Sequence, residues 1–168
     1  MRGKFFEHEM SMFTYDLTYD YSLDFNITQV DPRNIDNDEV VTVSFSVTPG
    51  EQGNYDYIGF WSPADADPES TVPVKMAWCD EDADYYTTGT GSLTFNLTNL
   101  RADGVFYFLT GGQEYPTVKH KAENMTVTFN SFATPLRPRV MPSGDVDKMW
   151  VMWSADGSAT EPKLEWGT

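Results

Sequence analysis

The chain has 168 residues, a formal net charge of −15 and 15% aromatic residues. Its length suits one domain or slightly more, and its aromatic content is too high for a disordered chain. The negative charge argues against nucleic-acid binding, which needs a basic face, and against docking on anionic lipid. No run of about 18 apolar residues is present, so we expect no membrane insertion.

Residues 1–21 are an expected N-terminal extension, without the apolar stretch and cleavage site of a secretory signal peptide. Strand patterns then recur between clusters of Gly, Pro, Asn and Asp, with no convincing helix of about ten residues or more. The clearest is EVVTVSFSV, in which apolar residues alternate with polar ones. The predicted strands of this region are 23–30, 39–47, 57–62, 74–78, 92–98, 105–110 and 125–130.

Half-buried strands of this kind suit two antiparallel sheets packed face to face. Residues 22–133 therefore predict an all-β fold, an immunoglobulin/fibronectin-like antiparallel β-sandwich. The stretch TPLRPRVMP then indicates an edge or a linker, because proline cannot donate a hydrogen bond to a neighbouring strand. We place a domain boundary near residue 134.

Residues 134–168 predict the first strands of a second, incomplete sandwich. The expected strands are 137–141, 148–154 and 163–166. Two or three strands rarely bury enough apolar surface to be stable alone, and an unpaired strand edge promotes aggregation. We therefore expect residues that are not in this sequence, or a protein partner, to cover this edge.

Acidic residues raise the question of a calcium site. Asp80, Asp82 and Asp84 alternate as in the loop of an EF-hand, but Tyr85 and Gly91 stand where that loop has its glycine and its glutamate. No helix is predicted on either side. A solvated turn is the expected structure.

The remaining metal ligands and nucleophiles are few. Neither His8 nor His120 belongs to an HxH or HExxH pattern, and His120 falls in a charged stretch, 119–121, that we expect to be an exposed connection. Cys79 is the only cysteine, so it is expected to be a small buried hydrophobe or, in a longer chain, the partner of a later cysteine. We assign no catalytic, cofactor-binding or metal-binding residue.

The five tryptophans lie on or beside predicted strands, where core packing is the expected role. Trp150 and Trp153 have opposite parity in their strand, so they point to opposite faces. We expect Trp153 to face inward, which leaves Trp150 as a platform for a glycan or a partner.

Three N-glycosylation sequons begin at Asn26, Asn96 and Asn124. Apolar residues alternate with each asparagine, so all three are predicted on the polar face of a strand. These sites favour a secreted, extracellular or lumenal protein whose signal peptide is not in the sequence. Exposed asparagines also occur without glycans, and that alternative stays open.

A series of short motifs runs in order through the middle of the chain. They are YDYIGFWSPAD at 55–65, PVK at 73–75, GSL at 91–93, LRAD at 100–103 and GG at 111–112. This region resembles the N-terminal region of the large purple acid phosphatases of plants and algae. The segments NMTVTF and PLRPR resemble the junction that follows there, and the last twenty residues resemble the opening of a fibronectin-type-III-like domain before the phosphatase domain.

The resemblance implies a non-catalytic N-terminal accessory region of a purple acid phosphatase-like metallophosphoesterase. It also implies that the partner covering the strand edge of residues 134–168 is a missing C-terminal phosphatase domain. The parent would hydrolyse phosphate monoesters at acid pH with a dinuclear site of Fe with Zn, Mn or Fe. The metal-binding motifs GDxG, GNH and GHxH do not occur in the 168 residues, so no cofactor is expected in this chain. The alternative is an extracellular structural or binding β-sandwich module of a larger assembly that has no phosphatase domain.

Overall fold

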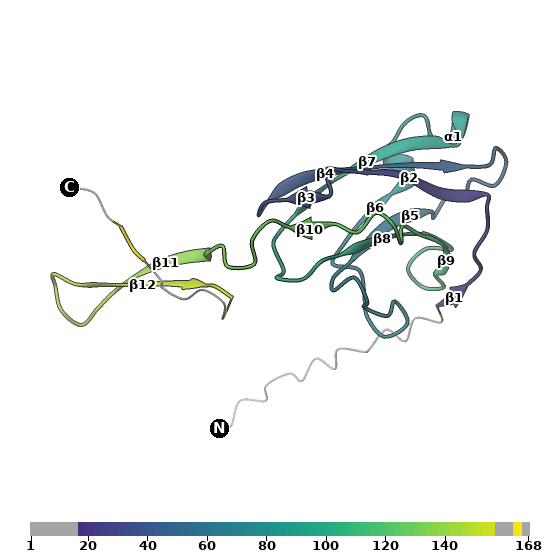
Figure 1. Ribbon diagram of the computed structural model, residues 1–168. Coiled ribbons are helices and arrows are strands. Elements are labelled where there is room, and N and C mark those ends of the chain that lie inside the picture. Colours follow the sequence, from purple (N-terminus) through teal and green to yellow (C-terminus); the bar gives the residue numbers. More distant parts are fainter. Residues whose placement is uncertain (1–16, 157–162, 166–168) are drawn as a thin grey trace, which may run out of the picture.

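The computed structural model describes residues 17–156 and 163–165 (Figure 1). A three-stranded sheet has the order β2 (Phe25–Asp31), β4 (Glu39–Val47) and β7 (Thr90–Leu97). A five-stranded sheet has the order β1 (Thr18–Tyr19), β9 (Thr117–Lys121), β8 (Val105–Thr110), β5 (Tyr57–Trp61) and β6 (Lys75–Trp78). Two smaller pairs are β3 (Asn34–Ile35) with β10 (Thr128–Phe129) and β11 (Leu136–Pro142) with β12 (Met149–Ser154). The helical segments are η1 (Cys79–Glu81) and α1 (Tyr85–Thr88).

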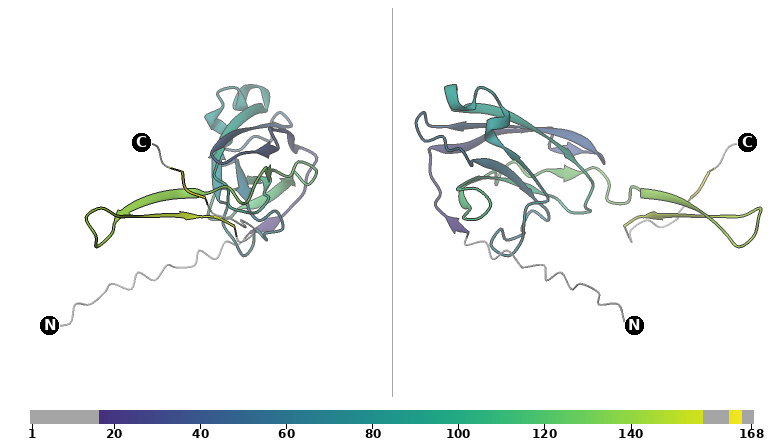
Figure 2. Two further views of the ribbon diagram at one scale, coloured as in Figure 1. Left: turned by 60° about the vertical axis from the view of Figure 1, so that its left-hand side comes forward. Right: turned by 180° about the vertical axis from the view of Figure 1, so that it is seen from behind.

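The two larger sheets lie face to face and enclose the main core (Figures 1 and 2). In β4 every second residue from Val41 to Val47 is buried, because successive side chains of a strand point to opposite faces. The rings of Phe45 in β4 and Phe108 in β8 meet across the core with centroids 5.9 Å apart. The all-β sandwich predicted from the sequence is confirmed.

Strand bounds follow the sequence patterns closely in the sandwich. The strands predicted at 39–47 and 105–110 are confirmed to the residue as β4 and β8. The prediction at 125–130 is too long, because β10 covers two residues and pairs only with the short strand β3. The stretch 119–121, predicted as an exposed connection, lies instead in β9, which pairs with β8 and with β1. Since β1 falls within residues 1–21, ladder pairing starts earlier than the boundary placed at residue 22.

A second apolar cluster lies on the outer face of the five-stranded sheet. Trp61 is 2% exposed there, and its ring meets that of Tyr107 edge-on with centroids 5.1 Å apart. Gly59 makes room for it, because a Cβ on Gly59 would lie 2.4 Å from Trp61 Cζ3. The acidic loop 63–72 covers the ring, and the carbonyl of Thr71 accepts a 3.2 Å hydrogen bond from Trp61 Nε1. Buried residues of this outer cluster are Tyr57, Trp61, Val105, Tyr107, Leu109 and Val118.

Beyond the sandwich, β11 and β12 form an antiparallel hairpin that extends away from it (Figures 1 and 2). These are two of the three strands predicted for the second unit. The third prediction, 163–166, is wrong over 163–165, where the chain is exposed and forms no strand. Trp166 lies outside the described residues. A strand needs a partner for its ladder hydrogen bonds, and residues 163–165 pair with no strand in the described part of the chain.

Candidate functional site: the junction and the hairpin

Arg101 joins the sandwich to the hairpin. It lies in the loop between β7 and β8, and its guanidinium donates hydrogen bonds to the main-chain carbonyls of Phe132 and of Ser154, the second at 2.9 Å. Ser154 ends β12, whereas Phe132 belongs to the segment that leaves the sandwich. One side chain therefore holds both sides of the junction, and charged donors make the stronger class of hydrogen bond.

The backbone of Arg101 is itself held in place. Its φ of 63° lies in the left-handed region, and its amide donates to Asn99 Oδ1 at 2.9 Å. Asn99 is buried, and its amide nitrogen donates to the carbonyl of Ser131 at 2.7 Å. A non-glycine residue at positive φ persists where the surroundings fix it, so this network orients Arg101 towards the hairpin.

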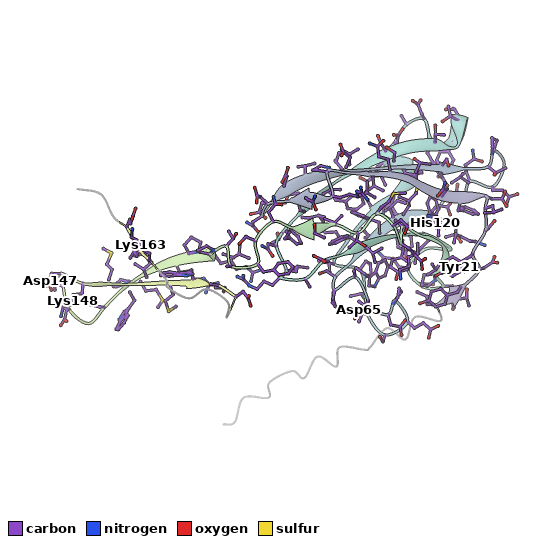
Figure 3. All side chains as sticks on the ribbon, in the orientation of Figure 1. Tyr21, Asp65, His120, Asp147, Lys148 and Lys163 are labelled. Carbon is purple, nitrogen blue, oxygen red and sulfur yellow. The ribbon has the colours of Figure 1, made fainter. Side chains whose placement is uncertain are left out.

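The hairpin presents apolar side chains on both of its faces (Figure 3). Val140 is paired with Val151 on one face, and Met141 with Trp150 on the other. Trp150 is 64% exposed, whereas Leu136 is the one buried residue of β11 and β12. A two-stranded hairpin is marginally stable alone, and contiguous apolar surface in a soluble protein marks an interaction site. The hairpin is therefore a candidate interaction surface. Its exposed large apolar residues are Val140, Met141, Val146, Met149, Trp150 and Met152.

The tryptophans divide as follows. Trp61 is buried as expected, and Trp153 is half-buried while Trp150 is exposed, in agreement with their opposite parity. Trp78 is half-exposed at the end of β6, so it is not a core residue.

The acidic turn has an evident structural role. The carboxylate of Asp82 accepts backbone hydrogen bonds from Ser92 at 2.8 Å and from Asp84 at 3.0 Å, and these bonds lower its pKa. Such bonds tie the turn to the start of β7. Among the described residues, no group of three or more His, Cys, Asp or Glu side chains is arranged to hold a metal ion.

Cys79 and His120 were assigned no catalytic role from the sequence, and burial shifts the pKa of both. Burial raises the pKa of the Cys79 thiol, so the reactive thiolate is disfavoured. His120 lies half-buried in β9, where burial lowers its pKa, and His8 lies outside the described residues.

No helix of the described residues is long and apolar enough to cross a membrane.

The three sequon asparagines are all exposed. Asn26 lies in β2 and Asn96 in β7, on the outward face of the three-stranded sheet as predicted. Asn124 lies in a turn, so its predicted place on a strand face is wrong. The amide nitrogen of Asn96 donates a 3.2 Å hydrogen bond to the carbonyl of Asp38, whereas the side chains of Asn26 and Asn124 make no hydrogen bond to the described residues.

Comparison with known proteins agrees with this architecture. The family model of the Fn3-like domain from purple acid phosphatase matches residues 27–131. The chain belongs to this family. The matched range lies within the first sandwich, for which a fibronectin-like fold was predicted from the sequence. The Fn3-like domain thus comprises the two sheets that precede the junction.

Two relatives and one solved structure that this chain matches are much longer than it is. "Probable inactive purple acid phosphatase 27" of Arabidopsis thaliana is 30% identical over 140 residues, 74% of this chain and 23% of the relative. "Probable inactive purple acid phosphatase 1" of the same plant is 32% identical over 146 residues, again 23% of the relative. Purple acid phosphatase PPD1 from yellow lupin (Lupinus luteus) seeds is similar in structure, with a TM-score of 0.62 and 26% identity over 75% of this chain and 25% of that one. The chain therefore spans about a quarter of the length of the relatives it matches.

Sequence reasoning used LRAD at 100–103 only as a family motif and did not predict what Arg101 contacts. The positive φ of Arg101 depends on its hydrogen bonds to distant segments, which the sequence pattern does not show. The LRAD motif was the one available signal at this position, and it does not name the groups that Arg101 contacts.

Proposed function

We propose that this chain is the non-catalytic N-terminal accessory region of a larger purple acid phosphatase-like metallophosphoesterase. The Fn3-like domain folds as a complete sandwich, and the hairpin then joins it to the rest of the protein. The observation that carries this proposal is the hairpin, which has two apolar faces and is anchored to the sandwich through Arg101. Further strands of a second sandwich, and the phosphatase domain behind them, are the proposed cover for these faces.

The catalytic metals of the proposed parent would be held outside this region. A dinuclear site of Fe with Zn, Mn or Fe needs several nitrogen and oxygen ligands on convergent loops. The described residues supply one histidine, His120, and no cluster of suitable ligands, so they do not fit such a site. The net charge of −15 also repels phosphate dianions. Hydrolysis of phosphate monoesters at acid pH is therefore proposed for the parent and not for this chain.

Secretion is the proposed location. All three sequon asparagines are exposed, which is what glycan attachment requires, and the side chains of Asn26 and Asn124 make no hydrogen bond that a glycan would break. Asn124 is the favoured site, since a turn gives an enzyme access from more directions than a strand. The test is mass spectrometry of the native protein before and after enzymatic removal of N-glycans. An unmodified mass at all three sites would contradict secretion through the glycosylating pathway.

The size of the native protein tests the main proposal. An antibody raised against the 19.0 kDa chain should detect a native polypeptide several times larger. A native polypeptide of the size of this chain would instead support the alternative, a binding or structural module without a phosphatase domain.

Phosphatase activity needs a test apart from the size of the native polypeptide, because two relatives carry the words "probable inactive" in their names. The 168-residue chain is incubated with a chromogenic phosphate ester at acid pH and with added ferric and zinc ions. No turnover is expected from the chain, whereas the native protein should hydrolyse the ester. Metal-dependent turnover by the purified chain would contradict the accessory role.

A further inference from the structure

A groove lined by aromatic residues lies at one end of the five-stranded sheet. It has a volume of about 450 Å³ and lies where β5 begins and where β6 and β8 end. This volume is within the range of sites that hold small ligands, roughly 300–1,000 Å³. The lining residues are Tyr55, Trp78, Gly111, Gly112, Gln113, Glu114 and Tyr115.

The aromatic residues of the groove are unusually exposed. Tyr55 is 66% exposed and Tyr115 is 68% exposed, although each carries a large apolar ring. Trp78 lies half-exposed near them, and its ring meets that of Tyr57 edge-on with centroids 5.5 Å apart. Tyrosine and tryptophan offer large, rigid contact area with few rotatable bonds, which is why they are common in binding sites.

The loop that carries Tyr115 is held in one shape. Gly111 and Gly112 both have left-handed φ values, 82° and 73°. A Cβ on Gly111 would lie 2.4 Å from the carbonyl oxygen of Tyr115, so only glycine fits there. The amide of Gly112 donates a 3.1 Å hydrogen bond to the carbonyl of Tyr55, which fixes the loop beside that residue. The groove is therefore largely preformed, and binding costs little ordering.

The polar groups of the groove are mainly acceptors. The carboxylate of Glu114 makes no hydrogen bond or ion pair with the described residues. The side-chain amide of Gln113 donates one N–H to Met76 Sδ at 2.8 Å, which leaves its oxygen and its second N–H. Each phenol of Tyr55 and Tyr115 both donates and accepts. A suitable ligand must bring several hydroxyl donors together with flat apolar surfaces.

We propose that this groove binds neutral carbohydrate, as a short run of pyranose rings. The apolar face of a pyranose ring stacks on an aromatic side chain, while its hydroxyls donate to Glu114 and to the Gln113 oxygen. Charge excludes anionic glycans, since the groove has no cationic side chain and the chain carries −15. A proline-rich peptide fits less well, because proline has no N–H with which to satisfy Glu114. This activity is independent of the proposed phosphatase parent.

The test uses the whole 168-residue chain and defined neutral oligosaccharides. Cellohexaose, xylohexaose and mannohexaose are titrated against the chain, up to millimolar concentration, by calorimetry and tryptophan fluorescence. At least one of them should bind, and Tyr115→Ala should weaken that binding about tenfold through the lost stacking surface. Because Tyr115 is exposed, this variant should melt at the same temperature as the parent chain. Glu114→Gln tests the acceptor role and should weaken binding without altering the aromatic surface.

Tyr21→Ala is the matched control, because Tyr21 is a tyrosine 60% exposed that does not line the groove, and its removal should leave binding unchanged. The proposal fails if none of the three oligosaccharides binds, or if Tyr115→Ala and Tyr21→Ala have equal effects. Tighter binding of a galacturonic acid hexamer or of a proline-rich peptide than of the neutral sugars would also overturn it.

Discussion

Replacing Arg101 with alanine tests how the sandwich and the hairpin are held together. The substitution removes both hydrogen bonds of the guanidinium. The bond to the carbonyl of Ser154 is exposed, and its loss should weaken attachment of the hairpin by about 0.5–1.5 kcal/mol. The carbonyl of Phe132 is partly buried, so leaving it without a donor should cost the sandwich about 1–3 kcal/mol.

Hydrogen exchange measured by mass spectrometry separates these two effects. A loss of about 1 kcal/mol corresponds to roughly a fivefold larger population of the opened state. Amides of β11 and β12 should therefore exchange about fivefold faster in Arg101→Ala, whereas the central strand β4 should change only through global stability. Urea unfolding followed by tryptophan fluorescence gives that global value independently.

Arg137 supplies a matched control. It also has a left-handed backbone, with φ 54°, and it is exposed and makes no hydrogen bond to the described residues. Arg137→Ala therefore removes the same side chain from the same backbone conformation, and exchange in β12 should stay unchanged. Arg101→Lys should be intermediate, since one ammonium group cannot match the planar fork of donors. Equal exchange rates in Arg101→Ala and the parent chain would refute the proposed junction.

Three further outcomes follow from the structure. Asp56 is 4% exposed and accepts hydrogen bonds from the Tyr85 hydroxyl and the Gly53 amide. Burial raises the pKa of this carboxyl above 3.8. Its contribution to the stability of the fold is therefore present below pH 3.8 and is lost as the pH rises through the raised pKa. Asp56→Asn should flatten the fall in melting temperature from acid to neutral pH; a profile parallel to that of the parent chain would contradict this. Trp61→Ala should lower the free energy of unfolding by about 3–5 kcal/mol and should speed proteolysis within loop 63–72. An unchanged rate of cleavage in this loop would show that other contacts hold it. Glycan removal should leave the melting temperature nearly unchanged, because the sequon side chains lie at the surface, and a large drop on deglycosylation would argue for a structural glycan.

Several features of this protein were determined by the sequence alone. The strands β4 and β8 were predicted to the residue, because alternation in one and a continuous apolar run in the other are local patterns that any sandwich must bury. The strands β11 and β12 were also predicted, although their pairing with each other was not, and the opposite orientation of Trp150 and Trp153 follows from the same alternation. A period of two decides which face of a strand a side chain occupies, and it does so before any tertiary contact forms.

Tertiary structure decided what covers each face. Trp61 and Trp78 both lie at strand ends, yet loop 63–72 covers the first and leaves the second at the rim of a groove. The charged strand β9 has too few apolar residues to be predicted, and it forms because β8 and β1 supply its hydrogen-bond partners. Arg101 meets Ser154 across 53 residues of sequence, and such contacts depend on how whole sheets and hairpins come together rather than on any local pattern.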